Sequence, residues 1–347
     1  MSKIRTLLYP YSRRIRAYVK YHKTLSEELE LVSLVSPKGW GLEGDKVEAL
    51  DQKYIVKTSF EEELESCDAV LFCEDGEYVL EEEILKEKLQ LAQNNGKRIL
   101  FSRKETLLFC NNKLEQNVKL ENQKYRIHPL FARQKIKIDI PIIAIISTND
   151  NYDYCEVLLG MKHIFEKEGY KVLGIGNVPN LPLNITALPD YINDESIKMN
   201  DKSILFSHFL KLKTFEEKPD VVIIALTEDT NDIIEGFDVT IKSIVSSIEI
   251  DYAILCATYD EVCQDNVEQN KNRILKEYAV NINSIHVSPY IRGEDDKFSH
   301  IKMKSMIEID EEDVLNYISN KRMGEITYLC KYENVQNIVE KIVDELS

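Results

Sequence analysis

Short runs of apolar residues alternate along this chain with longer stretches in which apolar residues recur every three or four positions. Short runs bounded by turn residues are typical of buried β-strands, and the longer periodic stretches are typical of helices. Alternation of the two predicts parallel sheets with helices packed on both faces. We therefore expect an α/β fold made of two Rossmann-like three-layer α/β domains with mainly parallel sheets.

We place the first domain, a Rossmann-like α/β domain, at residues 1–110. Ser12 and Ser59 precede predicted helices and are expected to be their N-caps, and Glu62 follows Ser59 at the spacing of a capping box. The predicted strands are 6–9, 29–35, 54–58, 69–74 and 98–102, and the predicted helices are 12–23, 60–66 and 80–95.

Residues 111–139 are polar and weakly periodic, which predicts a connector between the domains. The second domain then covers residues 140–347, and its proline-rich segment 177–195 is expected to be a loop. Its predicted strands are 141–147, 170–175, 220–226, 252–257 and 283–287, and its predicted helices are 155–168, 201–217, 232–248, 261–279, 310–320 and 334–346.

The turn between the first strand and helix of the second domain has the position, but not the residues, of a phosphate-binding loop. In the pattern G-x-x-x-x-G-K-[ST], glycines let backbone N–H groups converge on phosphate and the Lys reaches its oxygens. With Ser147 at the first glycine, Tyr152 and Asp153 fall on the second glycine and the Lys, and Tyr154 falls on the hydroxyl residue. We therefore expect a P-loop-NTPase-like domain that lacks Walker A. The whole turn is Ser147, Thr148, Asn149, Asp150, Asn151, Tyr152, Asp153 and Tyr154.

An acid in place of the Lys turns attraction for phosphate into repulsion, each on the order of 4 kcal/mol at about 4 Å and a surface-like dielectric. The turn can instead cap its helix internally, or serve a cation, a peptide amine or another ligand. A second acidic loop carries Asp229, Asp232 and Glu235, which either hold magnesium or lie on the solvated surface. We expect no ATP hydrolysis and no bound metal.

Gly39, Gly41 and Gly44 form a G-x-G-x-x-G pattern after a predicted strand, the arrangement of a dinucleotide fingerprint. The pattern follows the second strand instead of the first, and Pro37 separates it from that strand. The next predicted strand also ends without an acidic residue. We favour a tight surface loop in which Trp40 and Asp45 contact a partner or ligand, with NAD binding as the alternative.

The segment after the first strand is basic and aromatic in an otherwise acidic chain. It carries Arg13 and Arg14 beside several tyrosines. Either it is the solvated face of an amphipathic helix, or these arginines dock an acidic peptide or a phosphate-bearing group.

Composition narrows the possible functions. There are 44 Lys and Arg against 60 Asp and Glu, and the resulting charge of -16 disfavours nucleic acid as a partner. The seven cysteines are scattered, without the spacing of a disulfide framework or a zinc site. No serine-hydrolase elbow is present. Without a signal-like or bilayer-length apolar run, we expect a cytoplasmic protein.

Three stretches, "SPKGWGLEGDK", "TSFEEELESCDAVLFCED" and "IPIIAIISTNDNYDYCEVLLGMKHIFEKEGYKVLGIG", resemble the clostridial peptide maturation system proteins encoded with ribosomally made, modified peptides. The resemblance implies a Rossmann-like domain joined to a P-loop-NTPase-like domain that works beside radical-SAM and other tailoring enzymes. The phosphate-loop turn of that family is often more glycine-rich and carries a Lys. This chain departs from it at Ser147, Asn149, Tyr152 and Asp153.

Together these features predict a non-catalytic accessory or scaffold protein, without a cofactor, that binds a precursor peptide or a tailoring enzyme. One alternative is a nucleotide- or NAD-dependent peptide-modifying enzyme. Another is a regulator that senses a small metabolite between the two domains.

Overall fold

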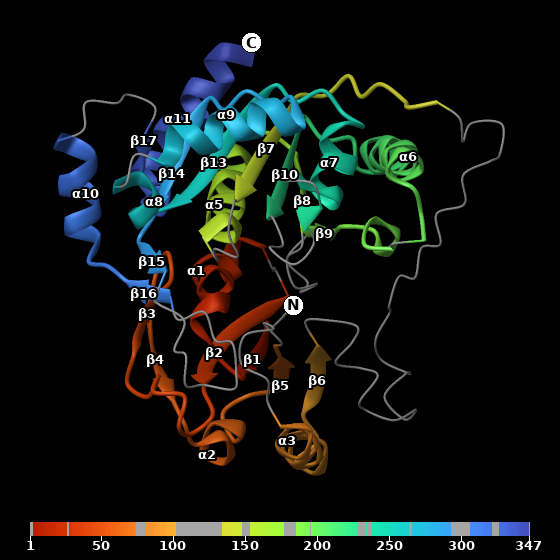
Figure 1. Cartoon of the computed structure of the whole chain (residues 1–347). Helices are drawn as coiled ribbons and strands as arrows, with labels where there is room; N and C mark the ends of the chain where they lie inside the picture. The colour runs from red at the N-terminus through yellow and green to blue at the C-terminus, as the bar shows by residue number, and fades with distance from the viewer. Residues whose placement is uncertain are drawn as a thin grey trace. The chain divides into compact units, whose positions relative to one another are not determined.

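The computed structural model describes residues 3–25, 28–73, 81–101, 134–147, 153–176, 185–194, 196–227, 233–234, 237–263, 266–292, 306–320 and 326–346. The chain forms two compact units, the first mainly from residues 1–123 and the second mainly from residues 124–177 and 188–347. Each unit is built around its own sheet (Figure 1).

The first unit contains a six-stranded sheet in the order β3-β4-β2-β1-β5-β6. All neighbours are parallel except the short β3, which pairs antiparallel with β4. Counted along the chain without β3, the order is 3-2-1-4-5, as in Rossmann folds. The strands are β1 (Ile4–Tyr9), β2 (Leu29–Val35), β3 (Lys46–Glu48), β4 (Lys53–Lys57), β5 (Ala69–Phe72) and β6 (Arg98–Phe101).

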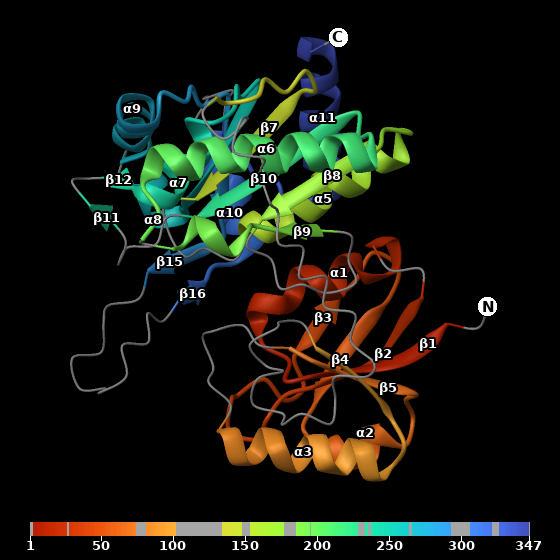
Figure 2. The same ribbon diagram turned by 90° about the vertical axis from the view of Figure 1, so that its right-hand side faces the viewer.

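Helices cover both faces of this sheet (Figure 2). On one side, a short 3₁₀ turn, η1 (Arg13–Ile15), leads into α1 (Arg16–Leu25), which packs on β2. On the other side lie α2 (Phe60–Leu64) and α3 (Glu82–Asn94). The core beneath α2 and α3 contains Leu7, Tyr9, Val35, Phe60, Leu64, Cys67, Val70, Phe72, Leu89, Ala92 and Ile99.

The second unit contains a seven-stranded sheet in the order β17-β14-β13-β7-β10-β8-β9. The pairs from β17 to β8 are all parallel, and β7 lies in the middle between β13 and β10. The strands are β7 (Ile142–Ser147), β8 (Val172–Gly176), β9 (Ile185–Ala187), β10 (Val221–Thr227), β13 (Tyr252–Thr258), β14 (Ser284–Ser288) and β17 (Ile326–Thr327).

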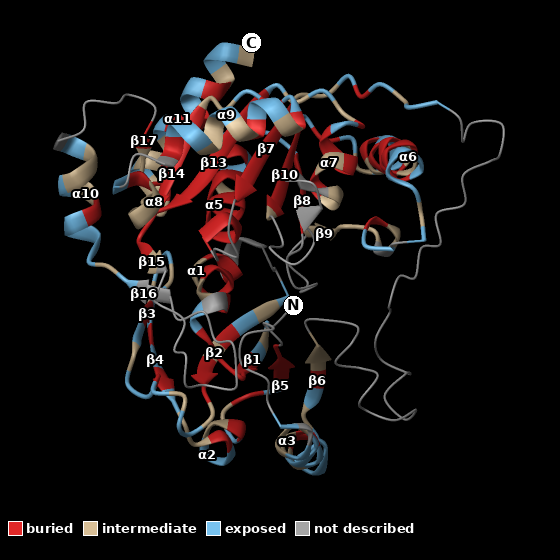
Figure 3. Ribbon diagram, viewed as in Figure 1, coloured by how far each residue is buried: buried red, intermediate tan, exposed pale blue. Residues whose placement is uncertain are grey.

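Two helical layers bury this second sheet. α6 (Met199–Glu217), α7 (Val239–Val245) and α9 (Asn266–Tyr278) pack on one face, where alternate residues such as Ala144, Ile146 and Leu255 form the core. α5 (Asp153–Lys167) and α11 (Tyr332–Leu346) pack against each other, and α5 also packs on β7, β8 and β10. α5 and the central strands are almost entirely buried (Figure 3).

Smaller elements complete the second unit. They are η2 (Asp190–Ile192), α8 (Tyr259–Cys263), α10 (Glu311–Asn320) and two antiparallel ribbons, β11 (Ile233–Ile234) with β12 (Phe237–Asp238) and β15 (Tyr290–Arg292) with β16 (Met306–Glu308). No helix in the described ranges is long and apolar enough to cross a membrane.

The expected fold class, two α/β units with mainly parallel sheets, is confirmed. Each predicted strand is present, with ends that differ by at most two residues. The helix predicted at 232–248 is wrong in its first half, because residues 233–234 and 237–238 pair as strands and α7 begins only at Val239. The helix predicted at 261–279 is divided into α8 and α9. Of the predicted connector, residues 111–133 lie outside the described ranges.

The two predicted N-caps are correct in position but not in bonding. Ser12 precedes η1 and Ser59 precedes α2, yet neither side chain makes a capping hydrogen bond. The Ser12 Oγ is buried without a hydrogen-bond partner among the described residues. The prediction of a capping box between Ser59 and Glu62 is therefore wrong, because the serine hydroxyl does not bond to the helix backbone.

Candidate functional site

The carboxyl edge of the second sheet brings together the ends of its central strands. β7 ends at Ser147, β13 at Thr258 and β14 at Ser288, and α5 begins at Asp153. Open α/β sheets bind ligands at this edge, where the strand order reverses. Chain order places that reversal at β7, the first strand of this sheet.

Polar residues occupy most positions on one face of β13 and β14 up to this edge, with the buried Ile254 as the apolar exception. The register aligns Cys256 with Ser147 on one side and with His286 on the other, so the three side chains share a face. On the same face, Tyr252 and Ser284 are hydrogen-bonded through their hydroxyls at 2.6 Å. The intervening residues, Ala253, Leu255, Ala257, Ile285 and Val287, are apolar and belong to the opposite core. A buried polar stripe therefore runs along two adjacent strands, where parallel sheets usually carry apolar residues on both faces.

At the end of this polar stripe, Asp153, His286 and Cys330 converge from distant parts of the chain. Asp153 Oδ2 lies 3.5 Å from His286 Nε2, and Cys330 Sγ lies 3.8 Å from the same nitrogen. One potential ligand atom from each residue lies within 4.8 Å of the others. His286 is completely buried, Asp153 is 4% exposed, and Cys330 is half-buried.

A backbone hydrogen bond fixes the tautomer of His286. The N–H of Leu329 donates to His286 Nδ1 at 3.0 Å, so Nδ1 is the acceptor nitrogen and the ring proton resides on Nε2. That proton faces Asp153 and Cys330. In this arrangement His286 cannot take a proton from the Cys330 thiol, so the pair is not a nucleophile with its general base.

The surrounding side chains are held in their neutral forms. Burial, reinforced by Asp153 and Cys155, raises the pKa of the Cys256 thiol well above its usual range. Burial also raises the pKa of Tyr328, whose ring stacks on that of His286 with centroids 5.9 Å apart. Neither Cys256 nor Tyr328 is therefore an activated nucleophile or base at neutral pH.

Two buried oxygens in this region have no hydrogen-bond partner among the described residues, namely Asp153 Oδ2 and Thr258 Oγ1. The 3.5 Å approach of His286 to Asp153 is an electrostatic contact and not a hydrogen bond. An unsatisfied buried polar group costs about 1–3 kcal/mol, and more when it is charged. An ionised Asp153 carboxylate can only accept, so its Oδ2 is placed for a donor or a cation, whereas the Thr258 hydroxyl can also donate.

The predicted turn is only partly described. Ser147 is fully buried at the end of β7, and Tyr154 is 8% exposed in the first turn of α5. Asp153 points toward His286. Thr148, Asn149, Asp150, Asn151 and Tyr152 lie outside the described residues, as do Asp229, Asp232 and Glu235.

In the first unit, the glycine loop does not occupy the nucleotide-binding position of a Rossmann fold. Gly39, Gly41 and Gly44 have φ values of 95°, 72° and 83°, a region that favours glycine. Their loop joins β2 to β3 instead of opening a helix. The turn after β1, where the fingerprint is expected, reads Pro-Tyr-Ser and contains no glycine.

Two of the predicted binding elements meet at one edge of the first unit. Arg13 Nη2 contacts Asp45 Oδ2 at 3.3 Å, with side-chain exposures of 49% and 37%. Such an exposed pair contributes about 0–1 kcal/mol to stability. Trp40, in the same loop as Asp45, is half-buried. The neighbouring tyrosines Tyr9, Tyr11, Tyr18 and Tyr21 are all buried and belong to the core. Of Arg14, only the backbone is described.

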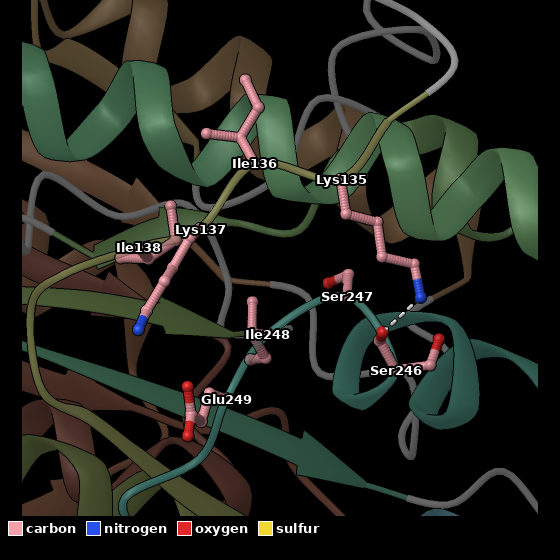
Figure 4. A pocket seen from close by; sticks show the side chains of 8 residues that line it. All are labelled: Lys135, Ile136, Lys137, Ile138, Ser246, Ser247, Ile248 and Glu249. Atoms are coloured by element: carbon pink, nitrogen blue, oxygen red, sulfur yellow. Dashed lines mark hydrogen bonds between the residues drawn. The ribbon is translucent and has the colours of Figure 1, made fainter.

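A separate cavity of about 290 Å³ lies between the segment before β7 and the segment after α7 (Figure 4). Lys135 Nζ donates to the backbone oxygen of Ser246 at 2.5 Å and ties the two segments together. The lining residues are Lys135, Ile136, Lys137, Ile138, Ser246, Ser247, Ile248 and Glu249. They include no histidine, cysteine or aromatic group, and we assign this cavity no chemistry.

Sequence reasoning identified Asp153 but not His286 or Cys330. Their spacing gives no metal or catalytic motif, because the three lie in separate elements of the second unit. The available signal was the alternation in Ser284-Ile285-His286-Val287-Ser288. A strand expected to be buried on both faces should not place a polar residue at every second position.

No protein-family model matches the chain, and no curated protein matches it in sequence. Among solved structures, it is similar to a DUF1611 family protein from Anabaena variabilis, with 11% identity and a TM-score of 0.59 over 99% of this chain and 100% of the other. It is also similar to a putative plasmid partition protein from Borrelia burgdorferi bound to AMPPNP, with 15% identity and a TM-score of 0.37 over 58% of this chain and 98% of the other.

A third similar structure is cobyrinic acid a,c-diamide synthase from Mycobacterium smegmatis with a bound ATP analogue and magnesium. It has 12% identity and a TM-score of 0.39 over 60% of this chain and 96% of the other. The second and third similarities have TM-scores below 0.5 and support no conclusion, and at 11% identity the first supports a conclusion about the fold alone. The chain shares the fold of the DUF1611 family protein over 99% of its length.

Proposed function

We propose that this chain is a cytoplasmic, non-catalytic accessory protein in the maturation of a ribosomally synthesised, modified peptide. It binds the precursor peptide or a tailoring enzyme such as a radical-SAM enzyme. The resemblance of three sequence stretches to peptide maturation system proteins motivates the pathway.

The observation that carries the non-catalytic part is the placement of Asp153. It stands at the position of the phosphate-loop Lys, and its carboxylate is buried and directed at His286. A buried carboxylate at this place repels a triphosphate, where the phosphate-loop Lys would attract it. A nucleotide-hydrolysing site is therefore disfavoured.

The surface we propose for peptide or enzyme binding is the loop of residues 36–45 together with Arg13. Arg13 is about half exposed beside Asp45, and a guanidinium at the surface is a residue type that binds carboxylates in a bidentate manner. The glycine backbone leaves open space around Gly39, Gly41 and Gly44. A half-buried Trp40 in the same loop supplies an aromatic anchor of the kind common at binding hot spots.

A pull-down of the full chain with the products of neighbouring genes tests this function. We expect a 1:1 complex that R13E weakens at least tenfold and that R98E, which changes an exposed arginine on β6, leaves unchanged. If R13E and R98E bound the partner equally well, the proposed binding surface around Arg13 would be wrong. Turnover of ATP by the purified chain would contradict the non-catalytic role itself.

A dinucleotide-dependent enzyme is the second candidate, favoured by the 3-2-1-4-5 strand order of the first unit. The absence of glycine after β1 argues against it, as does the presence of Ser36 where an acidic ribose ligand is expected after β2. Release of NAD from the purified, denatured protein would favour this enzyme over the accessory role.

A further inference from the structure

We propose that Asp153, His286 and Cys330 form a transition-metal site suited to Zn²⁺. The site is distinct from the peptide-binding surface and does not depend on the proposed function. Zinc takes carboxylate, imidazole and thiolate ligands at about 2.0–2.3 Å in tetrahedral geometry. Those bond lengths place neighbouring N and O ligand atoms about 3.4 Å apart, and N and S atoms about 3.5 Å apart. The two separations that involve His286 Nε2 are 3.5 Å and 3.8 Å here, within a few tenths of an ångström of those values, and all three donor atoms lie within 4.8 Å of one another.

The identity of the donors selects the metal. A thiolate and an imidazole favour zinc over magnesium or calcium, which prefer oxygen ligands. The three donors occupy three positions of a tetrahedron and leave the fourth for water or another ligand.

The state of Asp153 is a second, independent reason to expect a cation. Its Oδ2 is buried and has no hydrogen-bond partner within the described part of the chain. A buried carboxylate oxygen that has no protein donor is normally bound by an ion or an ordered water. A zinc ion bound to Oδ2 would supply the missing positive partner.

The hydrogen bond from Leu329 sets a limit on the affinity. Zinc must bind the Nε2 lone pair, so the ring proton has to leave Nε2, and a proton on Nδ1 would then oppose the Leu329 N–H. Metal-binding histidines normally donate their second N–H to an acceptor, and loss of that outer contact typically weakens metal binding 10–100-fold. We therefore expect binding weaker than at a four-ligand structural zinc site, accompanied by release of a proton and a shift of the turn at Leu329 and Cys330.

Metal titration of the chelator-treated full chain tests the site. We expect one Zn²⁺ per chain and a rise in melting temperature of roughly 5–10 °C at free zinc about 100 times the dissociation constant. Co²⁺ should give the near-ultraviolet absorption of thiolate-to-cobalt charge transfer and the intense visible bands of tetrahedral cobalt. A wild-type chain that shows no thiolate–cobalt band overturns the proposal.

Matched variants separate this cluster from other cysteines and histidines. C330S and D153N should each lower the metal affinity at least tenfold, and C330S should abolish the thiolate–cobalt band. The controls C263S, at an exposed cysteine on α8, and H163Q, on the outer part of α5, should bind like wild type. A band that survives in C330S overturns the site. The pull-down tests partner binding with R13E, whereas the titration tests metal binding with C330S and D153N. Failure of one proposal can therefore be told apart from failure of the other.

Discussion

The two units have similar parallel α/β sheets, but the residues at the carboxyl edges of these sheets differ in their chemistry. In the first unit, the edge carries an exposed Arg13–Asp45 pair and a glycine loop, with tyrosines buried beneath them. In the second unit, the edge carries a buried Asp153 that faces His286. The charged side chains at the first edge, Arg13 and Asp45, are solvent-exposed, whereas the Asp153 carboxylate at the second edge is buried. Strand order alone therefore predicts neither edge's chemistry, because the residues after each strand decide it.

The largest effect is expected in the apolar core of the second unit. Leu255 is fully buried on the face that α6, α7 and α9 cover, so L255A should lower the free energy of unfolding by about 2–5 kcal/mol. L275A, on the exposed side of α9 where the leucine is 47% exposed, should change it by less than about 0.5 kcal/mol. Urea denaturation measures both. Similar losses in the two variants would mean that this face is not the core.

A response to alkaline pH is expected in the first unit from Tyr9. Burial, reinforced by Glu61 and Glu87, raises the pKa of Tyr9 from 10.0 to about 12. A group whose folded pKa lies above its unfolded value contributes stability that is complete below about pH 10 and is lost as the pH rises toward 12. The contribution is on the order of 2 kcal/mol.

The contribution of Tyr9 can be measured from the free energies of unfolding of wild type and Y9F at several pH values between 9 and 11.5. The phenylalanine keeps the ring that packs on Phe60 and Phe72. We expect a smaller loss of stability with pH in Y9F. Parallel curves for the two proteins would contradict the assignment to Tyr9.

A smaller effect is expected in the polar stripe of the second unit. Y252F removes the hydroxyl that bonds Ser284 at 2.6 Å and leaves the Ser284 Oγ buried. The expected loss is about 1–2 kcal/mol. Y170F, at a tyrosine that is 37% exposed, is the matched control. If the two variants melt at the same temperature, the stripe is not maintained by this bond.

The smallest effect on stability is expected at the exposed edge of the first unit. R13A breaks the ion pair with Asp45, which is worth at most about 1 kcal/mol in water. Thermal unfolding at low and high salt should differ little between R13A and wild type. A loss above 2 kcal/mol would show that the pair is structural, which would weaken the case for Arg13 as a partner contact.

The sequence predicted the sheet strands well because each is a short apolar run between turn residues. It did not predict the two- or three-residue strands β3, β9, β15, β16 and β17, or the ribbon of β11 and β12, whose residues resemble the start of a helix. β9 and η2 lie in the segment 177–195 that was expected to be a loop, so that expectation is wrong for residues 185–187 and 190–192. Such short pairings depend on partners that local periodicity cannot identify.

Prediction of the candidate site was limited for a different reason. Asp153 could be found because the phosphate-loop pattern marks its position. His286 and Cys330 became neighbours of Asp153 only through the register of β7, β13, β14 and β17. Contacts between residues this far apart in the chain leave no spacing signal in one sequence.

The short strand β17 has a consequence for the order in which the second unit is completed during synthesis. β14 pairs with β13 on one side and with β17, Ile326–Thr327, on the other. Until residues 326–330 emerge from the ribosome, β14 is an open edge that can pair with another nascent chain. The same few residues then cover that edge and orient the imidazole of His286, so a chain interrupted before them should be both unfinished and prone to aggregate.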